Sequence, residues 1–234
     1  MYEDMVLHNR SELIEREEIE WANFWYDRAN EHPSHRILLM GDSTARLVRS
    51  TMAKMTETPV DLFATSSSFH DSLFIHQLDC FFTSEYQYDV AFVQFGHHGE
   101  LGFGGGLYKE EDWEIFRKEF RTFLDYLKTK VPRIIVESIF YSVIPQKKTF
   151  VNKVLLKCFH KKEQFDDEVN SRKNRKTKIM FEVAREMGIE TLDINNFMLT
   201  EGKRFIHTDH IHYEENAKVF ICNRMKECLR NENS

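Results

Sequence analysis

Apolar residues in this chain form short continuous runs, and stretches of helical periodicity separate these runs. The apolar runs predict buried strands at residues 36–40, 60–64, 91–95, 133–140 and 189–194. The periodic stretches predict helices at about residues 43–56, 70–82, 110–130, 171–187 and 213–230. Because the strands are apolar throughout, both faces of their sheet must be covered, as in parallel α/β sheets. We therefore expect one α/β domain over residues 35–234, with a mostly parallel, five-stranded sheet between two helical layers.

Residues 1–34 precede the first predicted strand, and part of this segment has a helical pattern of its own. Between residues 11 and 31, apolar side chains recur at helical spacing at Ile14, Trp21, Phe24, Trp25 and Ala29. The pattern predicts an N-terminal helical extension that docks on the core. Two tryptophans and a phenylalanine on one face would also suit a partner-binding or dimer surface.

The composition excludes several broad classes of protein. Of 234 residues, 41% are hydrophobic and 13% aromatic, which is too apolar for a disordered chain. A formal charge of −6 gives no general attraction to nucleic acid or to an anionic membrane. The four cysteines lack the spacing of a metal finger, and we expect reduced thiols. With no secretory signal at its start and no apolar run of about 18 residues, the chain is expected to be cytoplasmic.

Residues 147–178 differ from the rest of the chain in charge. They hold 11 lysines and arginines against 4 acidic residues, a local charge of +7 in a chain of −6. A solvated helical insertion would explain the excess, because charged runs usually face water. The functional alternative is a basic insertion at the mouth of an active site, where it would steer an anionic substrate.

The first candidate for chemistry is the sequence Gly41-Asp42-Ser43, at the end of the first predicted strand. A serine between a strand and a helix lies at the carboxyl edge of the sheet, where open α/β sheets bind ligands. Its N–H would belong to the first turn of the helix, which favours a developing negative charge. Arg46 follows about one helical turn later, on the same face. Taken alone, the three residues also fit a plain helix N-terminus with Ser43 as its cap.

A second polar cluster, residues 207–213, precedes the last predicted helix. A serine nucleophile needs an imidazole to take its proton and a carboxylate to orient that imidazole. Asp209 and His212 lie three residues apart and can supply both groups from one turn. The same cluster would also suit a metal ion, whose possible ligands are His207, Asp209, His210 and His212.

Together, the two clusters resemble the motifs of the SGNH/GDSL hydrolase superfamily. The resemblance covers about residues 35–230, through the order of the motifs and their positions relative to the predicted strands. It implies a three-layer, flavodoxin-like fold, with Ser43 as nucleophile, His212 as general base and Asp209 as the carboxylate that orients it. It implies a reaction that needs no metal ion and no organic cofactor.

The middle motifs depart from the common pattern of that superfamily and resemble one of its branches. Where the family usually has Gly-x-Asn-Asp, the chain has Gly96-His97-His98, so His98 stands in place of the asparagine that donates to the oxyanion. Gly-Asp-Ser-x-x-Arg together with a Gly-His block resembles the PC-esterase group of acyl esterases and glycan O-acetyltransferases. In that group Arg46 would supply the positive charge that the missing asparagine does not.

The resemblance therefore implies a set of oxyanion or substrate contacts beside the catalytic three, namely Arg46, Ser67, Gly96, His97 and His98. Ser67 belongs to this set because residues 64–69 contain no glycine where the family has its second oxyanion donor. The backbone N–H of a serine in this segment would then serve instead.

We therefore expect a serine esterase or O-acyltransferase that acts on an O-acyl ester of a carbohydrate, with acetyl as the first candidate acyl group. The expected substrate is a small molecule or a glycan, which the basic segment would bias toward an anion. Two alternatives stay open. One is a metal-dependent hydrolase built on the His/Asp cluster of residues 207–212, and the other is a non-catalytic binding protein, suggested by the missing asparagine and glycine. The sequence predicts no nucleic-acid partner and no membrane span, and it indicates no oligomeric state.

Overall fold

The computed structural model describes residues 21–31, 34–67, 69, 71–98, 110–144, 165–200 and 211–230. In chain order the elements are β1 (Ala22–Trp25), β2 (Arg36–Gly41), α2 (Ser43–Met55), β3 (Val60–Thr65), α3 (Ser72–Phe82), β4 (Tyr88–Gln94), α4 (Glu110–Lys128), β5 (Arg133–Glu137), α6 (Asp167–Glu186), β6 (Glu190–Leu192), α7 (Ile194–Thr200) and α8 (Glu215–Arg230). Among these elements, no helix is both long and apolar enough to cross a bilayer.

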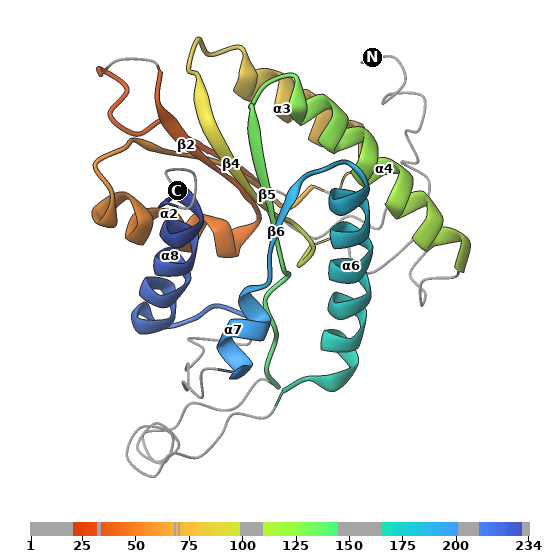
Figure 1. Ribbon diagram of the computed structural model, residues 1–234. Coiled ribbons are helices and arrows are strands. Elements are labelled where there is room, and N and C mark those ends of the chain that lie inside the picture. The colour runs from red at the N-terminus through yellow and green to blue at the C-terminus, as the bar shows by residue number, and fades with distance from the viewer. Residues whose placement is uncertain are drawn as a thin grey trace.

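The described strands form one six-stranded sheet in the order β1-β3-β2-β4-β5-β6. Strands β2 to β6 are parallel, and β1 pairs with β3 in the antiparallel direction. Figure 1 shows β4, β5 and β6 running the same way, so that their carboxyl ends lie at one edge of the sheet. The expected parallel sheet is confirmed, but the expected number of five strands is wrong because β1 adds a sixth.

The strand β1 also corrects the helix expected between residues 11 and 31. Residues 22–25 pair with β3, with Phe24 opposite Phe63 and Trp25 opposite Leu62. Phe24 stacks on Phe63 at 5.4 Å between ring centroids, whereas Trp25 lies over Arg49 of α2 at 4.8 Å. The side chains thus alternate between the two faces of the sheet, as strand residues do. Residues 1–20 lie outside the described residues.

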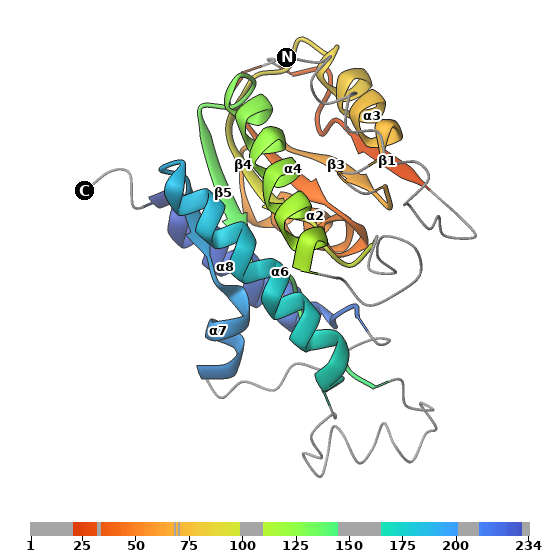
Figure 2. The ribbon, with the colours of Figure 1, turned by 90° about the vertical axis from the view of Figure 1, so that its right-hand side faces the viewer.

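Helices cover both faces of the sheet. Figures 1 and 2 show α3, α4 and α6 on one face and α2 and α8 on the other. Successive residues of β2 serve the two cores in turn: Leu38 and Met40 face the α3/α4/α6 side, and Ile37 and Leu39 face the α2/α8 side. All four are at most 3% exposed, which explains why the strand reads as a continuous apolar run.

Phenylalanines fill the core between the sheet and the α3/α4 layer. The ring of Phe69 contacts those of five others, Phe74, Phe95, Phe116, Phe120 and Phe123, at centroid distances of 5.1–6.2 Å. Tilted and edge-on ring pairs of this kind contribute about 0.5–1.5 kcal/mol each beyond their buried area. These phenylalanines therefore stabilise the fold by packing in its core.

A buried ion pair ties the amino ends of the central strands together. Arg36 of β2 and Asp61 of β3 are both fully buried, and two N–H groups of Arg36 donate to the two carboxylate oxygens at 2.8 and 2.6 Å. Tyr88 of β4 donates to the same carboxylate at 3.0 Å, and the backbone N–H of Asp27 does so at 2.8 Å. One carboxylate thus joins β2, β3, β4 and the segment after β1.

The basic stretch 147–178 divides into two parts. Residues 147–164 lie outside the described residues, and residues 167–178 belong to α6, the crossover helix between β5 and β6. Two of its lysines, Lys173 and Lys176, are 1% and 2% exposed. Over residues 167–178, the expectation of a solvated insertion is therefore wrong, because this helix packs on the sheet.

Candidate active site

The serine of the Gly-Asp-Ser sequence is the first residue of α2. Asp42 caps this helix, and its carboxylate accepts from the N–H and the hydroxyl of Thr44 at 2.9 and 2.8 Å. Gly41 allows the close approach of β4, since a Cβ there would lie 2.3 Å from the carbonyl oxygen of Gln94. Ser43 is 8% exposed, and its N–H is one of those that a helix N-terminus leaves without an intrahelical acceptor.

The structure brings the predicted base to the predicted nucleophile. Nε2 of His212 lies 2.8 Å from Oγ of Ser43, across 169 residues of sequence. His212 precedes α8, which lies against α2 on the same face of the sheet (Figure 1). Thr51 of α2 donates to Glu215 at 2.9 Å, at the start of α8, and so fixes this approach. The distance suits a proton transfer from the serine hydroxyl to the imidazole.

The other members of the His/Asp cluster lie outside the described residues. These are His207, Asp209 and His210. Within the part of the chain that is described, no group of three His, Cys, Asp or Glu side chains could hold a metal ion. The role of Asp209 as the orienting carboxylate and the metal alternative both stay predictions.

The loop after β4 contacts the residue that caps α2. The backbone N–H of His97 donates to the second carboxylate oxygen of Asp42 at 3.1 Å, so Asp42 fixes this loop beside Ser43. Gly96 has a φ of +141°, and a Cβ there would lie 2.3 Å from the side chain of Ile139. A glycine is therefore required at this position, where the backbone bends so that His97 meets Asp42.

Two buried lysines of α6 contact the same loop. Nζ of Lys173 lies 2.9 Å from Nδ1 of His97, 3.2 Å from the carbonyl oxygen of Phe140 and 2.5 Å from Oγ of Ser142. Nζ of Lys176 donates to the carbonyl oxygen of Gly96 at 3.4 Å. Lysine is rarely buried unless its charge is satisfied, and here backbone and side-chain acceptors surround it.

Arg46 and His98, which the sequence predicts as oxyanion or substrate contacts, both contact a third residue, Trp21. The guanidinium of Arg46 lies over the Trp21 ring at 5.2 Å, and the His98 ring meets the same indole edge-on at 5.9 Å. Oγ of Ser66 accepts from the backbone N–H of Trp21 at 2.9 Å and so holds this residue in place. Arg46 is exposed, and no carboxylate within the described residues pairs with it. This group therefore leaves a guanidinium one turn from Ser43.

Ser67 is placed differently from what its proposed role requires. Its backbone N–H already donates to Oγ1 of Thr65 at 3.0 Å, and that of Ser66 donates to the carbonyl oxygen of Trp21 at 3.0 Å. Neither N–H is available as an oxyanion donor in this arrangement. The group that Ser67 can offer to a substrate is its hydroxyl, which also accepts from Gln77 at 3.3 Å.

Burial and charge set the ionisation of two groups in the site. Burial lowers the pKa of His97 to about 3, with the cation of Lys173 adding to the effect and the carboxylate of Asp42 opposing it. His97 is therefore neutral at pH 7. Burial alone would raise the pKa of Asp42, but His97, His98 and the hydrogen bonds from Thr44 outweigh it and hold this pKa below its ordinary value. Asp42 therefore stays ionised.

Comparison with known proteins finds matches in structure but none in sequence. No protein-family model matches the chain, and no curated protein matches it in sequence. Solved structures do match. A protein from Slackia heliotrinireducens, assigned by inference to the SGNH hydrolases, shares 12% identity at a TM-score of 0.56, over 84% of this chain and 99% of its own. A GDSL-like lipase from Bacteroides thetaiotaomicron matches at 9% identity and a TM-score of 0.56, over 85% of this chain and 89% of its own.

A third match is an acetyl xylan esterase from Geobacillus stearothermophilus, at 12% identity and a TM-score of 0.53, over 82% of this chain and 93% of its own. Each match spans most of both chains. The chain has the SGNH hydrolase fold. In this fold, Ser43 and the loop of residues 96–98 follow two adjacent parallel strands, β2 and β4, at their carboxyl ends.

Some residues around the candidate site are not predictable from the hydrophobic and charge pattern of the sequence. That pattern places Trp21 on a helix face and treats Lys173 and Lys176 only as part of a basic run. A signal for the lysines is present: they recur at helical spacing with buried Met180, at positions where α6 faces the core. Trp21 carries no comparable signal, because its contacts with Arg46 and His98 join segments far apart in sequence.

Proposed function

We propose that the chain is a serine esterase or O-acyltransferase that acts on O-acyl, first of all acetyl, esters of carbohydrates through an acyl-Ser43 intermediate. The observation that carries the proposal is the 2.8 Å contact between Ser43 Oγ and His212 Nε2, at the N-terminus of α2 in an SGNH fold. A helix N-terminus, an imidazole and a serine together supply the anion site, the base and the nucleophile for acyl transfer.

In the first step, Nε2 of His212 takes the hydroxyl proton while Oγ of Ser43 bonds to the acyl carbon. The carbonyl π electrons move to oxygen and form an oxyanion. When the oxyanion collapses, the bond to the alcohol breaks, and the imidazolium returns its proton to the leaving oxygen. Asp209 would accept from Nδ1–H of His212, which keeps Nε2 as the basic nitrogen.

In the second step, the acyl group leaves Ser43. His212 takes a proton from water, or from a sugar hydroxyl, and that oxygen attacks the acyl-enzyme. The bond to Oγ then breaks, and Ser43 regains its proton from His212. Hydrolysis and transfer share every residue of this scheme and differ only in the attacking oxygen.

The oxyanion needs donors in place of the family's asparagine. The N–H of Ser43, at the first turn of α2, is one such donor, because the helix leaves it unpaired. Arg46 and His98, assembled around Trp21, are proposed as further contacts to the acyl oxygen or the sugar. A guanidinium suits this role as a charged donor, and a charge-assisted bond is roughly twice as strong as a neutral one.

Labelling of Ser43 is the direct test. A fluorophosphonate probe should modify the wild-type protein once, and Ser43→Ala should abolish the modification. Ser50→Ala is a matched control, since Ser50 is an exposed serine of the same helix whose hydroxyl bonds to the carbonyl oxygen of Leu47. An unlabelled wild-type protein that is folded would instead favour a non-catalytic binding protein.

A second experiment addresses the substrate. Acetate release from acetylated xylo-oligosaccharides should exceed release from p-nitrophenyl acetate in kcat/KM. Adding a free oligosaccharide acceptor should transfer acetyl groups to it if the enzyme is a transferase. If kcat/KM for p-nitrophenyl acetate is the higher and no acceptor is acetylated, the carbohydrate part of the proposal is wrong.

The preference for an anionic substrate rests mainly on residues 147–164, outside the described part. Within α6, Arg172, Arg175 and Lys178 have acidic partners in Glu168, Glu110 and Glu182. Steering by the remaining charges would be screened over about 8 Å at physiological ionic strength. We therefore expect kcat/KM to fall with added salt for an anionic acyl ester and not for a neutral one. An equal response of both esters would exclude steering.

A further inference from the structure

Lys173 contacts the ring of His97 in an arrangement that fixes where the imidazole carries its proton. An ammonium has three N–H donors and no acceptor. Among the described residues, Nζ of Lys173 has acceptors at hydrogen-bond distance in Nδ1 of His97, the carbonyl oxygen of Phe140 and Oγ of Ser142. Nδ1 of His97 can contribute to this set only as a lone pair. A neutral His97 must then carry its proton on Nε2.

The Nε2–H group that results is enclosed and has no acceptor among the described residues. His97 as a whole is 9% exposed. Leaving a buried N–H without an acceptor is destabilising, and nearly all buried N–H groups in proteins have one. The backbone N–H of the same residue donates to Asp42, directly before Ser43. The unused donor is thus carried by a residue whose backbone is fixed to the cap of the helix that begins at Ser43.

We propose that Lys173 is a positioning residue that locks His97 as its Nε2–H tautomer, so that His97 donates to the acyl oxygen as it becomes an oxyanion. This inference rests on the proposed acyl-transfer function for its last step only. Lys173 does not touch the reacting atoms. It supplies a rigid, charged donor that makes the other nitrogen of the ring an N–H, on the residue next to His98, which stands in place of the family's asparagine.

The chain offers a matched control in Lys176. Both lysines come from α6, both are at most 2% exposed, and both bond to the loop of residues 96–98. Lys176 donates to a backbone carbonyl oxygen rather than to the His97 ring. Lys173→Met and Lys176→Met therefore remove the same charge from the same environment, but only the first removes the donor to Nδ1.

The tautomer can be observed without any assay of activity. In protein labelled with ¹⁵N-histidine, long-range ¹H–¹⁵N spectra distinguish Nε2–H, Nδ1–H and the imidazolium for each ring. We expect His97 as the Nε2–H form at pH 7 in the wild type and in Lys176→Met, and a loss of this single form in Lys173→Met. A wild-type His97 in the Nδ1–H or imidazolium form would overturn the proposal, and this measurement needs no variant to fold.

The donor role is tested on the phosphonylated enzyme. A phosphonyl group on Ser43 places a P–O oxygen where the oxyanion would be, so the Hε2 resonance of His97 should move downfield on labelling. In kinetics, Lys173→Met should lower kcat by ~10²-fold with KM nearly unchanged, as for loss of an oxyanion donor. An unmoved Hε2 resonance on a labelled Ser43 would refute the donor role. A protein that does not label at all would refute the proposed function and leave the tautomer result standing.

Discussion

Ser43 and His212 lie in contact because separate features of the fold fix each of them. Asp42 caps α2 and also bonds to the loop after β4, so one carboxylate sets both the serine and the loop beside it. Gly41 allows β2 and β4 to approach closely at the same point. On the other side, Thr51 and Glu215 join α2 to α8. The 2.8 Å contact of the pair is therefore a result of backbone placement and not of side-chain flexibility.

We expect Ser43→Ala and His212→Ala each to lower kcat by ~10⁴–10⁶-fold, because the two residues act as a unit. For the same reason the double variant should lose little more than either single variant. Both replacements keep α2 and α8 intact, so the unfolding midpoint should change little. Rates with p-nitrophenyl acetate, with circular dichroism of each variant, provide the measurement. If Ser43→Ala kept a tenth of the wild-type rate, another nucleophile would be required.

Arg46 and His98 are expected to affect kcat more than KM. Both pack on Trp21 at the rim of the site, and a donor to the oxyanion contributes in the transition state rather than in the substrate complex. Each alanine variant should lose ~10²-fold in kcat. Arg46→Lys should recover only part of this, since an ammonium lacks the planar fork of a guanidinium. An increase in KM alone would assign both residues to ground-state binding of substrate.

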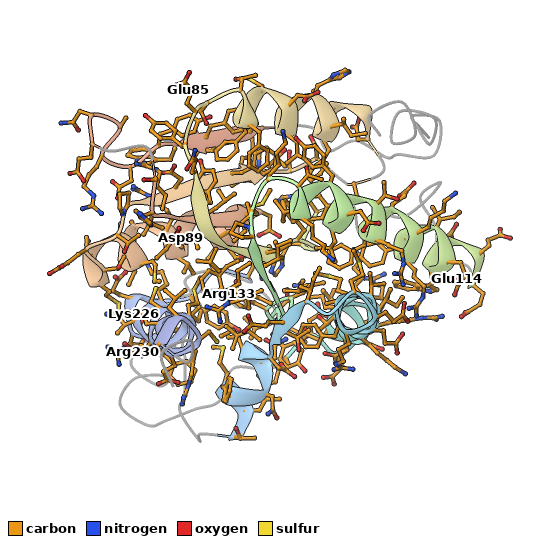
Figure 3. All side chains as sticks on the ribbon, turned by 45° about the horizontal axis from the view of Figure 1, so that its top comes forward. Glu85, Asp89, Glu114, Arg133, Lys226 and Arg230 are labelled. Carbon is orange, nitrogen blue, oxygen red and sulfur yellow. The ribbon has the colours of Figure 1, made fainter. Side chains whose placement is uncertain are left out.

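At the scale of the elements, the buried pair Arg36–Asp61 is the most consequential contact outside the site. Removing one partner of such a pair leaves the other charge buried and uncompensated. We expect Asp61→Ala to lower the free energy of unfolding by about 3–5 kcal/mol, as measured by urea denaturation. Asp89→Ala is the control, because Asp89 lies at the same end of the sheet with its side chain 60% exposed, beside His35 (Figure 3). Its loss should cost at most about 1 kcal/mol, and equal effects would contradict the argument.

The secondary-structure elements differ in how well the sequence predicted them. Strands such as β2 are buried on both faces, and a short, continuous apolar run between turn residues is typical of such strands. Around β1, residues Trp21, Phe24 and Trp25 fit helical spacing, yet Phe24 and Trp25 lie on opposite faces of a strand. Periodicity over so few residues does not separate the two structures. Pairing with β3, across about 40 residues, decides between them.

The candidate site likewise contains contacts that the sequence predicts and contacts that only the packing of the fold reveals. The contact between Ser43 and His212 could be predicted, because each is the residue type that acyl-transfer chemistry needs and each lies beside a predicted helix. The contact of Lys173 with His97 could not, because it depends on how α6 packs against the loop of residues 96–98. Charge in a sequence predicts solvent exposure by default, and only the packed helix shows two of these cations to be buried.

At the scale of the whole molecule, one buried acid makes stability depend on pH. Glu137, at the carboxyl end of β5, lines a cavity of about 10 Å³ between the sheet and the α2/α8 layer, together with Gln94. Neither Oε1 of Glu137 nor Nε2 of Gln94 has a partner among the described residues. Such a cavity has room for about one water molecule, which could bridge the two groups. Burial raises the pKa of Glu137 from its ordinary 4.5 to about 8.

The sign of the effect follows from the protons bound in each state. Between about pH 4.5 and 8 the folded protein keeps the proton of Glu137, whereas the unfolded chain has lost it. The folded state binds more protons, so the free energy of unfolding falls as pH rises through this window, by at most about 1.4 kcal/mol per pH unit from this group. Above about pH 8 both states are ionised, and this contribution levels off.

Glu137→Gln keeps the size of the side chain and removes the titration. We therefore expect urea midpoints measured at pH 6, 7.5 and 9 to fall less in this variant than in the wild type, and the variant to be the more stable protein at pH 9. Glu85→Gln is the control, because Glu85 stands at the surface after α3 (Figure 3) and should leave the wild-type profile unchanged. Other groups titrate in both proteins, so the difference between the two profiles isolates Glu137. Parallel profiles for the wild type and Glu137→Gln would show that Glu137 is already ionised in the folded protein at pH 6.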